Sequence, residues 1–200
     1  MGTVDRVLPW RRQHVEAANS ELTPLLASYR RRHPKSPVST ISRAYRVAAD
    51  AHQSQMRSSG ESYINHPLAV AQIVADLGLD EVSVTAALLH DAVEDQGGKP
   101  TAAAIRERFG DLVADIVDGC TDTDQTPKPP WRARKEAYLA RVRHEPAHVR
   151  LVSAADKRAE EVIFAELSRV RPGYGFLMEE RGVIEGSDRT HRWIVDPLDG

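Results

Sequence analysis

The stretch ALLHDAVEDQ, residues 87–96, places one histidine and three carboxylates within six residues: His90, Asp91, Glu94 and Asp95. Successive residues of an α-helix turn by about 100°, so all four side chains would share an arc of roughly 140°. Asp91 also continues an apolar stripe made by Val84, Ala87 and Leu88, which should face a core. A buried carboxylate is costly unless a positive charge compensates it. Either a cation binds at this face, or the face is solvated.

A second aspartate occupies the same kind of position in a later predicted helix. Asp156 lies on the apolar stripe formed by Val152, Ala155, Ala159 and Ile163. Two buried aspartates on separate helices of one bundle would repel each other unless a divalent cation lay between them. The two stripes together therefore favour a metal site over a solvated acidic face.

The histidines decide what kind of ion such a site would suit. His90 belongs to the acidic cluster, while His66 precedes Pro67 at a predicted helix start, where capping and metal binding are about equally favoured. Two imidazole nitrogens and two carboxylate oxygens suit Mn²⁺, Fe²⁺ or Zn²⁺ better than Ca²⁺. Water on such an ion is acidified and can attack phosphorus. Glu94 and Asp95 are placed to orient that water or to carry its proton.

The elements that must position these residues are mostly helical. Hydrophobic periodicity predicts helices over residues 20–32, 39–55, 67–78, 102–110, 112–119, 132–144 and 147–170, and one carrying the His-Asp cluster and ending before residue 97. After residue 170, turn glycines flank two short β-like runs, GFLM and RWIV. The predicted fold is mainly α: an N-terminal extension (1–38), a helical bundle (39–170) and a short incomplete α/β appendage (171–200).

Composition excludes several classes of protein. The 200 residues carry a net charge of −2, which indicates no nucleic-acid or membrane surface. Cys120 is the one cysteine, so an internal disulfide and a cysteine-based zinc site are excluded, and a reducing cytoplasm is expected. No apolar run approaches the roughly 18 residues of a membrane-spanning helix, and no signal peptide is evident. The oligomeric state is left open.

Three motifs together resemble the HD-type hydrolase domain of RelA/SpoT proteins and small alarmone hydrolases, over about residues 20–158. They are RSSGESYINHP (57–67), AALLHDAVED (86–95) and AADK (154–157), and the stretch 119–139 has the texture of the small stand-alone hydrolases. The resemblance implies an HD-type bundle that removes the 3′-pyrophosphate of guanosine tetra- or pentaphosphate (ppGpp, pppGpp) with one Mn²⁺, although other divalent metals would fit.

The same resemblance implies a role for each matching residue. It makes His66, His90, Asp91 and Asp156 the metal ligands. Glu94 and Asp95 would serve the attacking water, and Arg57 and Tyr63 would bind the guanosine nucleotide.

Two positions depart from the family pattern. Ser58 follows Arg57 where the family usually has lysine, and Glu160 stands where the family has an asparagine that helps to hold the nucleoside. These departures leave two alternatives open. In the first, the chain is an inactive or binding-only protein with an intact metal site. In the second, it is an HD phosphohydrolase that acts on another nucleotide.

The C-terminal part, about residues 151–200, resembles the N-terminal part of an inositol monophosphatase. In that frame Glu179, Asp196 and Asp199 would be Mg²⁺ ligands. Because the run VSAADK fits both families, we expect a chimera joined inside it, with a truncated phosphatase segment over residues 171–200. A phosphatase active on inositol phosphates is the weakest alternative.

Overall fold

A computed structural model describes residues 9–56, 61–96, 98–125, 127–178 and 182–195. The elements in chain order are α1 (Pro9–Arg32), α2 (Ser39–Ala51), α3 (Asn65–Asp76), α4 (Glu81–Leu89), α5 (Ala92–Asp95), α6 (Lys99–Phe109), α7 (Asp111–Cys120), α8 (Trp131–Val142), α9 (Ala147–Val170), β1 (Tyr174–Met178), β2 (Gly182–Ile184) and β3 (Asp188–Val195). The prediction of a mainly α chain with a small C-terminal β segment is confirmed.

Helix α4 forms the centre of the bundle, in contact with α2, α3, α7 and α9. Every residue from Ser83 to Leu89 is buried. A helix that is apolar on all sides is stable only when other helices surround it, which is the position α4 takes. Its first turn is fixed by Asp80, whose side chain accepts a hydrogen bond from the backbone N–H of Ser83 at 2.9 Å.

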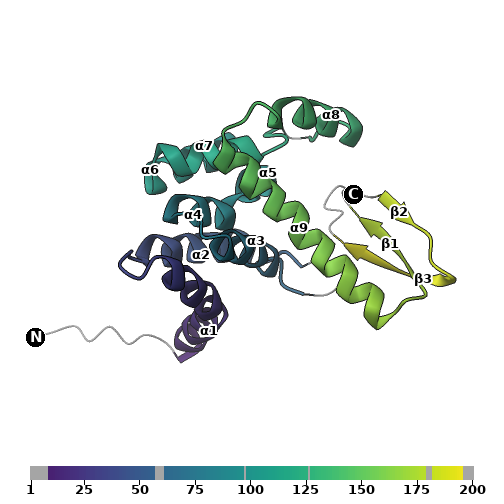
Figure 1. Ribbon diagram of the computed structural model, residues 1–200, viewed down its shortest axis with the longest axis horizontal. Helices are drawn as coiled ribbons and strands as arrows, with labels where there is room; N and C mark the ends of the chain where they lie inside the picture. Colours follow the sequence, from purple (N-terminus) through teal and green to yellow (C-terminus); the bar gives the residue numbers. More distant parts are fainter. Residues whose placement is uncertain (1–8, 57–60, 97, 126, 179–181, 196–200) are drawn as a thin grey trace, which may run out of the picture.

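Helix α9 connects the bundle to the C-terminal sheet (Figure 1). Its N-terminal half packs Val149, Val152 and Ala155 into the main core. Its C-terminal half contributes Phe164 and Leu167 to a separate small cluster under the sheet. Asp156 therefore sits near the middle of the helix, on the side that faces α3 and α4.

The sheet has the strand order β2-β1-β3, with β1 antiparallel to β2 and parallel to β3. Phe176 of β1 is paired with both Ile184 and Trp193 and, with Met178, forms the buried part of the small cluster. The prediction of two β runs missed β2, which has only three residues and is too short to display an alternating pattern.

The N-terminal helix is longer than predicted. We expected a loose entry and a helix from about residue 20, but α1 begins at Pro9, a residue suited to the first turn of a helix. Leu22, Leu25 and Tyr29 of α1 are buried in the main core. Among the described residues, no helix is both long and apolar enough to cross a membrane.

Candidate metal centre

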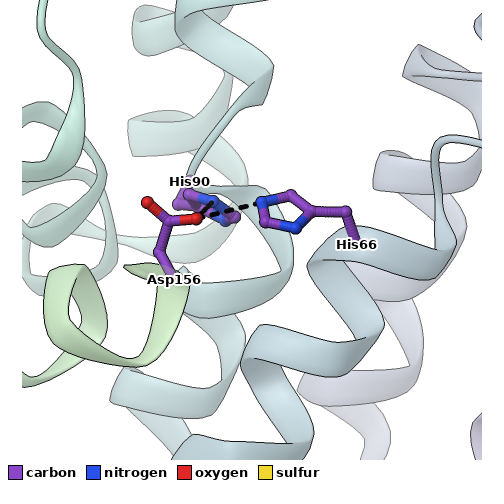
Figure 2. Close-up of side chains that lie close together, drawn as sticks. All are labelled: His66, His90 and Asp156. Carbon is purple, nitrogen blue, oxygen red and sulfur yellow. Dashed lines mark ion pairs between the residues drawn. The ribbon is translucent and has the colours of Figure 1, made fainter. Parts of the chain in front are cut away.

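Three helical segments far apart in the sequence bring two histidines and one aspartate together. His66 comes from the first turn of α3, His90 from the junction of α4 and α5, and Asp156 from the middle of α9. Nε2 of His66 lies 3.0 Å from Oδ1 of Asp156, and Nε2 of His90 lies 3.6 Å from the same oxygen. Figure 2 shows the imidazole rings and the carboxylate converging on one point. All three could offer a ligand atom to one ion.

Asp91 lies next to both histidines of this cluster. Its Oδ1 lies 2.9 Å from Nε2 of His90, and its Oδ2 lies 3.5 Å from Nε2 of His66. The hydroxyl of Tyr63 donates a hydrogen bond of 2.8 Å to Oδ2 and so fixes the orientation of this carboxylate. The four residues that the sequence suggested as ligands thus lie together.

The backbone at His90 and Asp91 differs from the prediction of one continuous helix. Helix α4 ends at Leu89 and α5 begins at Ala92. A carbonyl oxygen can only accept, so the Nδ1–H of His90 donates to the carbonyl oxygen of Ala87, at 2.8 Å. In a continuing helix that oxygen would accept from the amide of Asp91, and the side chain of His90 competes for it. The break lets two neighbouring residues point to one centre.

The same hydrogen bond indicates that a cation fits. With its proton on Nδ1, His90 presents a lone pair at Nε2, the form in which imidazole binds metals. This Nε2 is buried and has no well-aligned hydrogen bond from any described residue, although the Asp91 carboxylate is close. Buried polar atoms are normally satisfied, and a divalent ion among these oxygens and nitrogens would satisfy it.

The electrostatics of the cluster agree with that interpretation. Burial alone lowers the pKa of His66 and of His90, but the carboxylates of Asp156 and Asp91 outweigh it, so the pKa of both is raised. Burial opposes ionisation of Asp156, whereas Lys157 and the two histidines hold its pKa well below the usual range. Both aspartates are therefore ionised anions and attract positive charge.

Glu94 and Asp95 behave differently from these aspartates. Burial and the nearby Asp122 carboxylate raise the pKa of Glu94 to about 8, against the opposing effect of Lys128. Burial and the negative charge of Asp91 raise the pKa of Asp95. Carboxyl groups whose pKa values are shifted towards neutrality are suited to accept and release protons, which is the role the sequence suggested for this pair.

A cavity opens beside the four candidate ligands, and we call it the central cavity. Its lining comprises Tyr63, His66, His90, Asp91, Glu94, Asp95, Cys120, Asp122, Lys128, Lys135, Tyr138, Asp156 and Lys157. The three lysines were not singled out from the sequence. Their signal lay in the stretch 119–139 and in the residue after Asp156, but only the fold brings them to one cavity.

The remaining candidates fall in different places. Tyr63 lines the central cavity and contacts Asp91. Glu160 is buried on α9 but is not among the residues that line this cavity. Arg57 lies outside the described residues, and so do the C-terminal carboxylates Glu179, Asp196 and Asp199.

Known proteins match the chain in two parts. One curated relative is the bifunctional (p)ppGpp synthase/hydrolase RelA of Mycobacterium tuberculosis, 54% identical over 79 residues, or 40% of this chain and 11% of that protein. Another is an inositol-1-monophosphatase of Mesorhizobium japonicum, 76% identical over 49 residues, or 24% of this chain and 18% of that protein. The chain thus spans less than a fifth of the length of these relatives.

A solved structure, described as a metazoan orthologue of SpoT that hydrolyses ppGpp, is similar with a TM-score of 0.56 and 26% identity, over 64% of this chain and 74% of the other. The inositol monophosphatase family model matches residues 132–200. The HD domain model matches residues 44–162, more than half of the chain, and includes all four candidate ligands. The chain therefore belongs to the HD domain family.

Proposed function

We propose that this chain is a metal-dependent hydrolase that removes the 3′-pyrophosphate of ppGpp or pppGpp, releasing GDP or GTP and pyrophosphate. The observation that carries the proposal is the convergence of His66, His90 and Asp156, next to Asp91, beside the partly buried acids Glu94 and Asp95. The similarity to a SpoT orthologue that hydrolyses ppGpp supports the same substrate. The catalytic unit proposed is residues 39–170, and its place is the cytoplasm.

The roles of the residues follow from their positions. A divalent ion held by the two histidines and two aspartates, for which we propose Mn²⁺, would supply an acidified water able to attack phosphorus. Glu94 or Asp95 would take up the proton of that water and deliver it to the leaving group, since burial raises the pKa of each towards neutrality. Tyr63, which lines the central cavity, and Arg57 are the proposed contacts to the nucleotide.

The lysines of the central cavity are suited to a polyphosphate substrate. Lys128, Lys135 and Lys157 line the same cavity as the candidate ligands. Lys157 also donates to Oδ2 of Asp156 at 3.0 Å, and this bond leaves Oδ1 directed at the histidines. Fixed positive charges near a transferring phosphoryl group stabilise the charge that develops on its oxygens. We therefore propose that Lys128, Lys135 and Lys157 bind the pyrophosphate group.

A direct assay tests the proposal. Purified protein with Mn²⁺ and ppGpp should release GDP and pyrophosphate, and Glu94→Gln or Asp95→Asn should lower kcat by about 10²–10⁴ without loss of bound metal. Glu136→Gln, an exposed change of the same chemistry on α8, is the matched control and should leave kcat unchanged. Absence of turnover in the wild-type protein would reject the hydrolase assignment.

Two alternatives rest on a specific observation. Glu160 replaces the asparagine that the family uses near the nucleoside, and Ser58 replaces a lysine. A binding-only protein would retain ppGpp in equilibrium dialysis with Mn²⁺ and release no product. An HD phosphohydrolase for another nucleotide would leave ppGpp intact and release product from a different nucleoside polyphosphate.

We further propose that residues 171–200 derive from an inositol monophosphatase and take no part in the chemistry. The family match over residues 132–200 supports this origin. The sheet packs on the C-terminal half of α9 through its own apolar cluster, separate from the main core. In this proposal the sheet has a structural role, because it packs against Phe164 and Leu167 of α9.

A further inference from the structure

A buried arginine lies behind the pair of acids. The side chain of Arg134, on α8, is 3% exposed. Its NH1 donates to both carboxylate oxygens of Asp122, each at 2.8 Å, and to Oε1 of Glu94 at 3.3 Å. Its Nε donates to the carbonyl oxygen of Pro129 at 3.0 Å. One guanidinium thereby connects both ends of the loop between α7 and α8 to Glu94 on α5.

Arg134 is absent from the lining of the central cavity, although Glu94, Asp122 and Lys128 all line it. A bound nucleotide would meet these three side chains and not the guanidinium behind them. Any influence of Arg134 on a reaction in the cavity must therefore pass through the residues that it holds.

Both oxygens of Glu94 are engaged on this side. Oε1 accepts from Arg134 and, at 3.3 Å, from Nζ of Lys128, while the backbone N–H of Asp122 lies 3.4 Å from Oε2. Lys128 also donates to Oδ1 of Asp95 at 3.4 Å. Without these contacts the Glu94 side chain could adopt other rotamers, because its aliphatic part imposes no single orientation on the carboxylate.

Arginine is suited to this task for a geometric reason. Its planar guanidinium offers donors in fixed directions, whereas the ammonium of lysine is a point charge on a flexible stem. Burying the charge is costly unless it is fully paired, and the Asp122 carboxylate at 2.8 Å supplies that pairing. A buried pair of this kind contributes little net stability but fixes the position of what it contacts.

We propose that Arg134, locked by Asp122, is a positioning residue that holds the Glu94 carboxyl group at the productive place in the central cavity. The inference rests on the proposed function, in which Glu94 transfers the proton of the attacking water. A displacement of about 1 Å in a catalytic group can cost about 100-fold in rate. Arg134→Gln should therefore lower kcat by about 10–100-fold, with KM and bound metal nearly unchanged.

The matched control is Arg132→Gln, two residues away on the same helix, where the side chain is exposed and pairs only weakly with Glu136. Arg134→Lys keeps the charge but not the planar geometry, and should recover part of the lost kcat. Because Arg134→Gln removes the nearer cation from the buried Asp122 carboxylate, which keeps Lys135 at 3.5 Å, the substitution can unfold the protein, and the double variant Arg134→Gln/Asp122→Asn is the companion. It removes both charges, and its kcat should also be low.

Two outcomes overturn the inference. The first is that the kcat of Arg134→Gln is within twofold of the kcat of Arg132→Gln. If Arg134→Gln fails to fold, the same comparison is made with the double variant. The second is that kcat/KM falls by about 10–100-fold through a higher KM with kcat unchanged, which would place the arginine in substrate binding.

Failure of the proposed function is a separate result, seen as an inactive wild-type protein. In that case the urea unfolding midpoints of Arg134→Gln, Glu94→Gln and their combination still test the contact. The combined shift should differ from the sum of the single shifts, because neighbours in one network are not additive. Additive shifts would overturn the inference without any assay of activity.

Discussion

The pKa of Glu94 makes a quantitative prediction about stability. An acid whose pKa is about 8 in the folded protein and 4.5 in the unfolded chain binds its proton more tightly when folded. Its stabilising contribution is complete below pH 4.5 and is lost as the pH rises through about 8. In the presence of a chelator, the free energy of unfolding of the wild-type protein should therefore fall between these two pH values, relative to Glu94→Gln.

The size of the effect follows from the same two values. They are about 3.5 pH units apart, and each unit corresponds to 1.36 kcal/mol, which gives a ceiling of about 4.8 kcal/mol. The Glu94 side chain keeps 20% of its exposure and is coupled to the ionised Asp122, so water and neighbouring charges reduce that figure. We expect a change of about 2–4 kcal/mol across the interval.

The measurement is urea unfolding at pH 5, 6, 7 and 8 for the wild-type protein, Glu94→Gln and the exposed control Glu136→Gln. The histidines near Glu94 titrate in the wild type and in both variants, so their contribution largely cancels when the curves are subtracted. The wild type and the control should show the same slope, and Glu94→Gln a flatter one. Parallel curves for the wild type and Glu94→Gln would refute the raised pKa of this carboxyl group.

Three further predictions concern the metal, the cysteine and the C-terminal sheet. His90→Ala should lose the bound divalent ion while the exposed His148→Ala retains it, and equal metal content by elemental analysis would contradict the site. Burial raises the pKa of the Cys120 thiol to about 12. Iodoacetamide at pH 8 should therefore alkylate the metal-free native protein far more slowly than the urea-unfolded chain. Similar rates would show that the thiol is accessible. Deleting residues 171–200 should leave the metal content intact, and the full chain should release no phosphate from inositol monophosphate with Mg²⁺. Loss of metal on deletion, or release of phosphate, would show that this segment takes part in the function.

Local periodicity was enough to predict most of the bundle. The stripes that place Asp91 and Asp156 on buried faces depend only on the 3.6-residue repeat, and Val84, Ala87 and Val152 on those stripes are fully buried. The resemblance to a known hydrolase added His66, for which periodicity alone favoured capping and metal binding equally.

The sequence did not predict features that depend on contacts between distant segments. The break between α4 and α5 depends on a side chain competing for the carbonyl oxygen of Ala87, which no hydrophobic pattern records. Strand β2 exists because β1 offers a partner, since three residues carry no pattern of their own.

What the sequence determined, then, is which residue types face the interior of each helix, because side-chain direction repeats within a few residues. Only the tertiary structure decided that His66, His90 and Asp156 share one centre. It also decided that Arg134 reaches Glu94 across 40 positions of sequence. The first meeting depends on how α3 and α9 cross α4, and crossing angles are set by packing over whole surfaces rather than by any local motif.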